Sequence, residues 1–179
     1  MDDVITPDEV LATPRLSLRR LLEDDAPFLV ELLNDPAWLR YIGDKNVRTD
    51  EDARNYIRTG PWAMYRRVGH GNYLVRLKAG GQPIGMCGLL KRDALPDADL
   101  GFAFLPAYRR QGYAYEAARG VLGYARAVLG IGRIVAITTP DNRASAQLLE
   151  KLGFGFAGMT RMAEGAEELR LFANPAPAT

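Results

Sequence analysis

The sequence of 179 residues has little of what marks several classes of protein. Its one cysteine, Cys87, excludes an internal disulfide and is typical of a reducing compartment. No apolar run approaches the roughly 20 residues that a membrane-spanning helix needs. The formal net charge is +1, so we expect neither nucleic acid nor a membrane as partner. The acidic first residues lack the basic and apolar regions of a signal peptide, which predicts a cytoplasmic protein.

Common cofactor and metal motifs are missing as well. The chain has no G-x-x-x-x-G-K-[ST] phosphate loop and no G-x-G-x-x-G between a strand and a helix. No group of His, Cys, Asp and Glu has the spacing of metal ligands, so we expect no metal. The only histidine, His70, lies in a glycine-flanked turn and is interpreted as an exposed loop residue rather than a base.

What is present is the composition of a folded protein, with 47% hydrophobic and 25% charged residues. The length fits a single domain with a sizeable core. We expect residues 1–13 to be a loose lead-in, residues 14–174 to form the domain and residues 175–179 to be a tail.

Strand and helix patterns alternate through the domain. Apolar alternation or short apolar runs predict strands at 15–21, 72–78, 82–92, 98–105, 133–138, 156–161 and 168–173. Helical periodicity and capping signals predict helices at 23–34, 49–60, 115–129 and 142–153. Thr49 and Asp52 have the spacing of a capping box. This order indicates an α+β fold with a mixed sheet, and the strand–helix–strand unit predicts at least one parallel pair.

One predicted helix starts without a capping side chain. The stretch "PAYRRQGYAYEAARGVLGYA", residues 106–125, contains no Ser, Thr, Asp or Asn that could bond its first amides. Free amides after a glycine, Gly112, are typical of an anion site, and Arg109 and Arg110 can pair with phosphate oxygens. We therefore predict that a phosphate or diphosphate group of a ligand caps this helix.

The same residues carry a family resemblance. Arg109-x-x-Gly112-x-Ala114, directly after a strand, resembles the acetyl-coenzyme-A signature Q/R-x-x-G-x-G/A of the GCN5-related N-acetyltransferases, or GNAT superfamily. "NRASAQLLEKLGF", residues 142–154, resembles the next motif of that family. "TPRLSLRRL" followed by "DDAPFLVELLNDP" is similar to the opening of the branch that contains the ribosomal-protein N-terminal acetyltransferases. The three matches keep the family's order and extend over residues 13–173.

The resemblance implies a fold and an activity. The fold would be the GNAT acyl-CoA N-acyltransferase fold, a twisted, mostly antiparallel mixed sheet of about six or seven strands flanked by about four helices. The activity would be transfer of an acetyl group from acetyl-CoA to a primary amine, on a protein N-terminus or a small molecule, by direct attack in a ternary complex. A catalytically silent acyl-CoA sensor or scaffold, and a protein that binds another diphosphate nucleotide at the same helix, are the alternatives.

The resemblance also implies which residues bind the cofactor. Backbone groups of Phe104 and Leu105 would pair with the pantetheine arm and face the thioester carbonyl. Phosphate contacts would come from the side chains of Arg109 and Arg110. The remaining cofactor residues would be Gln111, Gly112, Tyr113 and Ala114, through their amides, and Asn142, on the pantetheine arm. The plainer interpretations are buried strand residues, a solvated arginine pair, a tight turn and a helix N-cap.

Two residues are candidates for proton transfer. Asp99, on the strand before the signature, would take the proton of the attacking amine, and Ser145 would protonate the departing thiolate. The plainer interpretations are a solvated acid at a strand start and a small packing residue. Segments 35–47 and 59–71, which hold both tryptophans, are expected as loops on the acceptor side. Both a monomer and a homodimer are compatible with the sequence.

Overall fold

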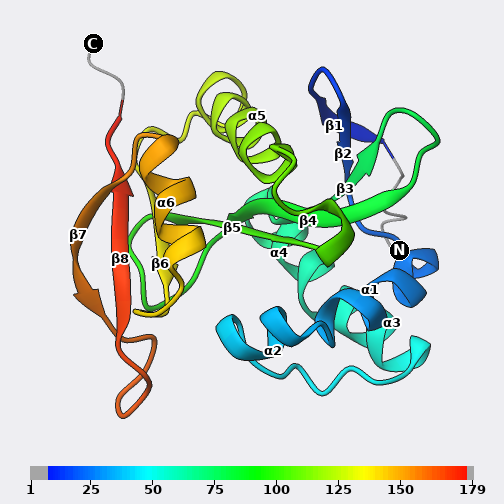
Figure 1. The fold of residues 1–179 in the computed structure, drawn as a ribbon, viewed down its shortest axis with the longest axis horizontal. Coiled ribbons are helices and arrows are strands. Elements are labelled where there is room, and N and C mark those ends of the chain that lie inside the picture. Colours follow the sequence, from blue (N-terminus) through cyan, green and yellow to red (C-terminus); the bar gives the residue numbers. More distant parts are fainter. Residues whose placement is uncertain (1–7, 177–179) are drawn as a thin grey trace.

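An eight-stranded sheet organises residues 8–176, the part of the chain that the computed structural model describes. Residues 1–7 and 177–179, parts of the predicted lead-in and tail, lie outside it. The strands are β1 (Glu9–Ala12), β2 (Leu16–Arg19), β3 (Asn72–Leu77), β4 (Pro83–Leu90), β5 (Ala98–Phe104), β6 (Ile134–Thr138), β7 (Gly155–Thr160) and β8 (Leu169–Asn174). They lie in the order β1-β2-β3-β4-β5-β6-β8-β7, and only β5 and β6 are parallel (Figure 1). The predicted α+β fold with a mostly antiparallel mixed sheet is confirmed.

Helices cover both faces of this sheet. Helices α1 (Ala26–Leu33), α2 (Pro36–Tyr41), α3 (Asp50–Thr59) and α4 (Pro61–Val68) lie on one side, and α5 (Tyr113–Ala127) lies on the other (Figure 1). Helix α6 (Arg143–Lys151) shares the buried cluster of α5. Short 3-10 turns precede α1 and α5, at Glu23–Asp25 and Pro106–Tyr108. None of the helices in residues 8–176 is long and apolar enough to cross a membrane.

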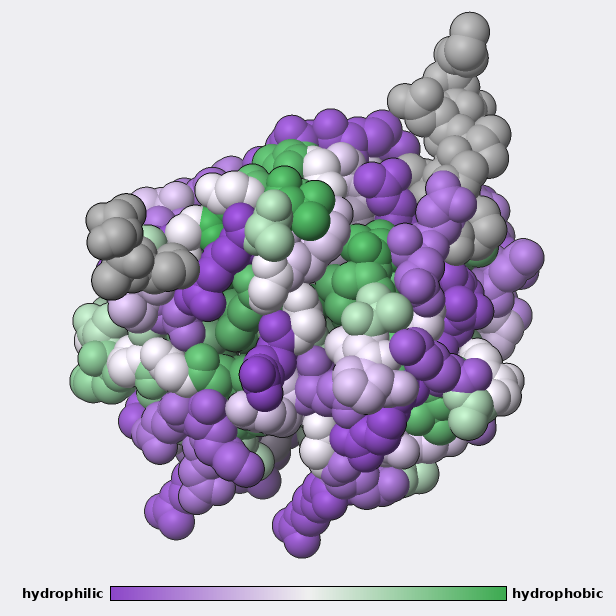
Figure 2. All heavy atoms as spheres, turned by 90° about the horizontal axis from the view of Figure 1, so that it is seen from above, coloured by the Kyte–Doolittle hydropathy of each residue, from purple (hydrophilic) through white to green (hydrophobic). Residues whose placement is uncertain are grey.

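The two faces bury separate clusters of side chains. Leu74 and Met86 belong to the cluster under α1 and α3, whereas Val75 and Cys87 belong to the cluster under α5. Because strand residues alternate between faces, these residues set the faces of β3 and β4 up to the register shift between them, where Ile84 joins the cluster under α5. On the α5 side, hydrophobic residues reach the surface in small areas separated by hydrophilic ones, as is usual for a protein surface (Figure 2).

The capping box of α3 is present, with the Thr49 side chain accepting from the Asp52 amide and the Asp52 carboxylate accepting from the Thr49 amide. Helices α2 and α4, in contrast, occupy the two segments that we expected as loops. Pro36 and Pro61 stand at their first helical positions, where the missing N–H costs nothing and the fixed φ favours the helix. A proline that indicates a break in a sequence pattern is here the start of a helix.

Strand β1 lies within the predicted lead-in and accounts for one strand more than the six or seven expected. It pairs antiparallel with β2, and Val10 and Leu11 pack against the cluster under α5. Its four residues are too few to show strand periodicity. The pairing with β2 makes the strand, so the sequence pattern alone did not reveal it.

The parallel contact between β5 and β6 is short. Only Ala98 with Ile134 and Asp99 with Val135 are in register, and the strands diverge beyond these two pairs. β5 stays paired with β4 as far as Phe104, and β6 stays paired with β8 as far as Thr138. The divergence therefore opens a wedge-shaped gap within the sheet whose narrow end is at Asp99.

Close backbone packing in the sheet gives a stability prediction. A Cβ at Gly88, on β4, would come 2.0 Å from the carbonyl oxygen of Gly71, whereas one at Gly123, on α5, would meet nothing within 4 Å. We expect Gly88→Ala to lower the free energy of unfolding by about 2 kcal/mol or more, because backbone has to move. Gly123→Ala, the matched control, should raise it by up to about 1 kcal/mol. Urea unfolding followed by circular dichroism measures both, and equal stability of Gly88→Ala and wild type would contradict this packing.

Candidate functional site

The first turn of α5 has free amides, as the sequence predicted. Its N-cap is Gly112, in the left-handed region at φ 81°, and no side chain caps the helix. Arg110 is also left-handed, at φ 59°, although it is not a glycine. Such a conformation costs roughly 1 kcal/mol or more and is concentrated at functional sites. Left-handed residues before a helix turn successive N–H groups to one side, which is the geometry of a concave anion site.

Arg109 does not point at this helix start. Its Nε donates to the carbonyl oxygen of Phe104 at 3.0 Å, and its Nη2 donates to the Asp35 carboxylate at 2.5 Å. Asp35 is buried and also caps α2 through the amide of Ala37. The expected contact of the Arg109 side chain with phosphate therefore differs from the structure, because a buried carboxylate already pairs with the guanidinium. Arg110 is exposed and has no carboxylate partner within residues 8–176.

A different arginine lies beside the helix start. Arg15, just before β2, donates from Nε to the Glu116 carboxylate at 2.6 Å and from Nη1 to the Gln111 carbonyl at 3.1 Å. Its guanidinium carbon is 4.3 Å from the centre of the Tyr113 ring. No sequence pattern predicted Arg15 at this position. The only signal for it was its place in the "TPRLSLRRL" segment of the resemblance.

The two backbone positions expected to face a cofactor, Phe104 and Leu105, differ in the direction of their N–H groups. The Leu105 amide donates to the Ile84 carbonyl at 3.0 Å, so it continues the ladder with β4 and is occupied. Because successive residues of a strand direct their N–H and C=O groups to opposite sides, those of Phe104 are turned toward the gap. The Phe104 carbonyl accepts from Arg109 there.

Asp99 stands at the narrow end of the gap and is buried. Its side chain is 2% exposed and lies 2.6 Å from Nε of Arg92. Burial raises its pKa to about 6, against the lowering effect of the Arg92 guanidinium. Its Oδ1 is buried and has no hydrogen-bond partner among the described residues. The interpretation as a solvated strand-start acid is therefore excluded.

The side of the sheet to which Asp99 belongs follows from its register. Asp99, Gly101 and Ala103 alternate onto the face of Met86, which is covered by α1 and α3. A Cβ at Gly101 would meet Asn72 Oδ1 at 3.7 Å, an ordinary van der Waals contact, so there is room for a small group at this position. A polar cleft of about 190 Å³ lies on the same side, lined by Lys45, Asn46, Val47, Asp52, Asn55, Tyr56 and Thr59.

Asn142 and Ser145 lie at the start of α6. Asn142 is the N-cap of the helix, and its Oδ1 accepts a hydrogen bond from the Ser145 amide at 3.2 Å. The preceding residue, Asp141, pairs with Arg40 of α2 at 2.9 Å. Ser145 is half-buried on the α5 side of the sheet. Asp99 and Ser145 thus approach the gap from opposite faces.

His70 is buried, not exposed as the sequence analysis expected. Its side chain is 6% exposed and its Nδ1 lies 2.8 Å from the carbonyl oxygen of Leu89. Gly69, in the left-handed region, ends α4, and the chain folds the histidine back over β4. Its contact is with backbone at the far side of β4 from the gap, so it is a structural residue.

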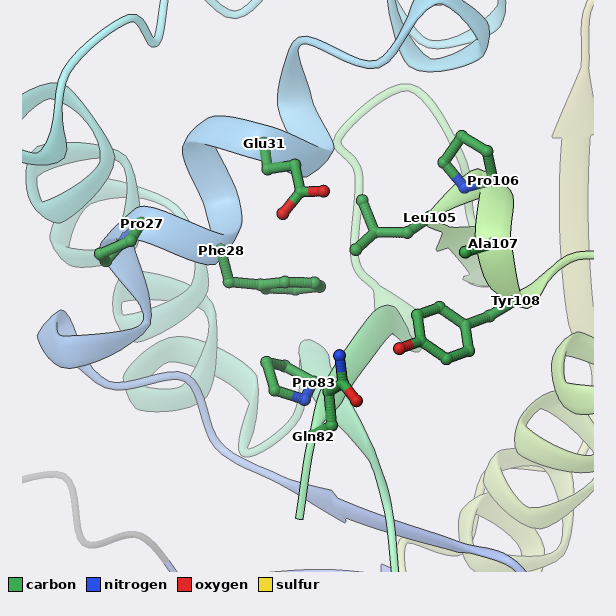
Figure 3. A pocket seen from close by; sticks show the side chains of 9 residues that line it. All are labelled: Pro27, Phe28, Glu31, Gln82, Pro83, Leu105, Pro106, Ala107 and Tyr108. Carbon is green, nitrogen blue, oxygen red and sulfur yellow. The ribbon is translucent and has the colours of Figure 1, made fainter. Parts of the chain in front are cut away.

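A larger cleft, of about 650 Å³, adjoins the loop after β5. Phe28 and Tyr108 face one another across it, with Leu105 on the wall between them and the Glu31 carboxylate at its rim (Figure 3). Pro27, Gln82, Pro83, Pro106 and Ala107 complete the lining. Apart from Leu105 it contains none of the predicted site residues. It lies on the β4 edge of β5, not in the gap toward β6.

Comparison with known proteins settles the family. A sequence model of the acetyltransferase (GNAT) domain matches residues 15–155. The chain belongs to the GNAT acetyltransferase family. An uncharacterized N-acetyltransferase of Bacillus subtilis, YoaA, is 31% identical over 156 residues, which cover 85% of this chain and 86% of YoaA. The predicted superfamily is thereby confirmed, and GNAT proteins use acyl-coenzyme A as donor.

Solved GNAT structures share the fold. An acetyltransferase of the GNAT family from Bacillus anthracis has a TM-score of 0.75 and 26% identity, with 92% of this chain and 97% of that chain covered. The ribosomal L7/L12 alpha-N-protein acetyltransferase RimL, solved in complex with coenzyme A, has a TM-score of 0.81. Its identity is 19%, over 96% of this chain and 100% of RimL, so this likeness concerns the fold alone.

The buried state of Asp99 predicts a pH effect on stability. An unfolded aspartate has a pKa near 3.9, so between about pH 4 and pH 6 the unfolded chain releases this proton while the folded chain keeps it. Rising pH therefore costs the wild-type fold stability over this range, and Asp99→Asn lacks that cost. We expect the unfolding free energy of Asp99→Asn minus that of wild type to increase by roughly 1–3 kcal/mol between pH 4 and pH 7. Urea unfolding at both pH values measures this difference in unfolding free energy. A difference that does not change with pH would show that the pKa of Asp99 is not raised.

Proposed function

We propose that this GNAT protein transfers an acetyl group from acetyl-coenzyme A to a primary amine by direct attack in a ternary complex. One observation carries the proposal. The loop after β5 leads to the uncapped start of α5 at Gly112, and beyond the buried carboxylate of Asp99 strands β5 and β6 leave an unpaired gap. An extended ligand along it has its phosphates at the helix and its reactive end beside a proton acceptor.

The donor set at the wide end of the gap fits a diphosphate. The amides of Gln111, Gly112, Tyr113 and Ala114 begin α5 without a protein cap, and the helix dipole favours negative charge there. We assign these amides to the pyrophosphate and the exposed Arg110 to its outer oxygens. Arg109 is assigned to the loop itself, because it pairs with Asp35 and holds the Phe104 carbonyl.

The middle of the gap fits an extended arm ending in a thioester. The Phe104 amide faces the gap, and we assign it to the bound acyl-CoA, where a preorganised N–H donor can polarise a carbonyl. Leu105, whose amide bonds Ile84, contributes its side chain to the cluster under α1 and not a free N–H. Asn142 uses Oδ1 for the α6 cap, and its Nδ2 is assigned to the arm. Bound acyl-CoA supplies the activated acyl carbon.

Asp99 and Ser145 divide the proton transfers between the two faces. The amine nitrogen attacks the carbonyl carbon, the carbon–sulfur bond breaks, and the amine loses one proton. Asp99 accepts that proton through its unpartnered Oδ1, on the α1–α4 side. A pKa of about 6 leaves it mostly ionised and still basic at neutral pH. Ser145, on the α5 side, gives its proton to the departing thiolate and regains one from solvent.

The acceptor enters over the α1–α4 face, where Gly101 leaves space beside Asp99. A protein N-terminus and a small-molecule amine both satisfy this geometry. RimL, with the same fold, is described as an alpha-N-protein acetyltransferase, which supports including N-terminal peptides among the acceptors tested. A library of amines and peptides, scored by release of free coenzyme A thiol, tests the activity. Cofactor binding without any thiol release would instead identify a silent acyl-CoA sensor.

Gly112 gives the cofactor-site prediction. Its φ of 81° disfavours a β-branched residue, and a Cβ would also lie 3.3 Å from Nη2 of Arg15. We expect Gly112→Val to abolish detectable coenzyme A binding in calorimetry. Gly165→Val is the control, because Gly165 has a φ of 73° with open space around it and lies in the turn between β7 and β8. Loss of binding in both variants, or in neither, would remove α5 as the phosphate site.

Asp99 and Ser145 are tested by turnover with an identified acceptor. We expect Asp99→Asn to lower kcat by about 100-fold or more and Ser145→Ala to lower it by about 10-fold, because each removes a proton-transfer group. The dissociation constant of acetyl-coenzyme A should stay within about twofold of wild type in both, since neither residue holds the phosphates. Undiminished kcat in either variant would take that residue out of the reaction.

A further inference from the structure

Arg15 is held at the first turn of α5 by several contacts to one carboxylate. Its backbone amide and its Nε donate to the two oxygens of Glu116, at 2.8 Å and 2.6 Å. The Thr13 hydroxyl donates to the same carboxylate at 2.6 Å. Half of the Arg15 side chain remains open to solvent, with 46% exposed. The guanidinium is thus fixed in place at the surface and not buried in the core.

From this position Arg15 orients one peptide of the phosphate loop. Its Nη1 donates to the Gln111 carbonyl at 3.1 Å. That carbonyl and the Gly112 N–H belong to the same planar trans peptide and point in opposite directions. Holding the carbonyl on the Arg15 side therefore turns the Gly112 N–H away from Arg15, toward the open side of the loop. This N–H is one of the donors assigned to the pyrophosphate.

The N-terminal hairpin brings Arg15 to the helix. Strands β1 and β2 pack beside α5, and the side chains of Leu11 and Thr13 lie against Gly120. A Cβ at Gly120 would come 2.9 Å from Thr13 Cγ2 and 3.0 Å from Leu11 Cδ1. The close approach fixes the hairpin on α5 one to two turns from the loop. The loop is consequently shaped by a segment about 100 residues away in the sequence.

We infer that Arg15, anchored by Glu116, is a positioning residue of the cofactor site, which presents the Gly112 amide to the pyrophosphate of coenzyme A. The inference rests on the proposed function and extends the site beyond the signature motif to the N-terminal hairpin. Arg15 thus acts on the phosphate loop from its outer side. The signature arginine, Arg109, does not have this role, because it pairs with Asp35.

Glu116 distinguishes positioning from simple charge attraction. A carboxylate near a bound pyrophosphate repels it, so on electrostatic grounds alone Glu116→Ala should tighten coenzyme A binding. If Glu116 serves to anchor Arg15, the same substitution frees the guanidinium and the loop peptide, and binding weakens. The sign of the change decides between the two.

The experiment is calorimetric titration of coenzyme A into the full chain. We expect Arg15→Gln to weaken binding by about tenfold, and Glu116→Ala to weaken it by about threefold or more. Arg15→Lys keeps the charge, but its ammonium group cannot reach Glu116 and Gln111 together. We therefore expect it to recover less than half of the affinity for coenzyme A that Arg15→Gln loses, on a logarithmic scale. Arg54→Gln, which removes an exposed arginine paired with Glu51 on α3, is the control and should bind like wild type. Thermal unfolding of each variant checks the fold.

Each result has one meaning. Wild-type affinity in Arg15→Gln, tighter binding in Glu116→Ala, or full recovery in Arg15→Lys would overturn the positioning role while the proposed function stands. Absence of coenzyme A binding by the wild-type chain would overturn the proposed function, and the inference with it. If Arg15→Gln does not fold, Glu116→Ala and Arg15→Lys still give the decisive comparison.

Discussion

The short parallel contact between β5 and β6 is the constraint on which the site depends. Two residue pairs hold these strands together, and beyond Asp99 each strand continues with a different neighbour. The backbone groups along the inner edges of the gap therefore lack a strand partner and are left to bind something else. Asp99 is buried at the last pair, where an ionised carboxylate has little water to solvate it. The divergence thus leaves unpaired backbone groups beside Asp99, and burial raises the pKa of that carboxyl to about 6.

Charge is distributed along this gap in a way that suits a long anionic ligand. At the wide end, Arg110 and the α5 amides offer positive potential to the outside, whereas Arg109 is neutralised by Asp35. At the narrow end the Asp99 carboxylate pairs with Arg92. The Arg92 side chain is 40% exposed, so solvent or a bound molecule can reach it. Asp99 lies on the face of the sheet covered by α1 and α3, whereas Ser145 lies on α6, which shares the buried cluster of α5.

The features that the sequence predicted well are local ones. The uncapped start of α5 followed from the absence of Ser, Thr, Asp and Asn before it, and the α3 cap followed from Thr49 and Asp52. The strand-helix order with one parallel pair followed from periodicity. Segments 35–47 and 59–71 were expected as loops, but Pro36 and Pro61 within them are the first residues of helices α2 and α4. Strand β1 was missed because its pairing, not its pattern, makes it a strand.

The partners of charged side chains lay outside the reach of sequence reasoning. Arg109 meets Asp35 across 74 residues, and Arg15 meets Glu116 across 101 residues. No spacing rule links such pairs, because the fold alone brings them together. The same holds for His70, whose glycine-flanked turn indicated exposure although its ring bonds the Leu89 carbonyl. Roles for individual arginines are therefore the part of the site that needed coordinates.

Helix α2 has a mechanical consequence for the two halves of the molecule. Asp35 at its start pairs with the loop after β5, and Arg40 near its end pairs with the loop after β6. The helix thus ties the two parts of the sheet to each other, in addition to the β5–β6 pairs and the buried cluster under α5. In the Arg109–Asp35 ion pair the carboxylate is buried. In the Arg40–Asp141 ion pair both side chains are more than half exposed, so this pair weakens as the salt concentration increases. Rising salt therefore weakens the tie from α2 to the loop after β6 more than its tie to the loop after β5.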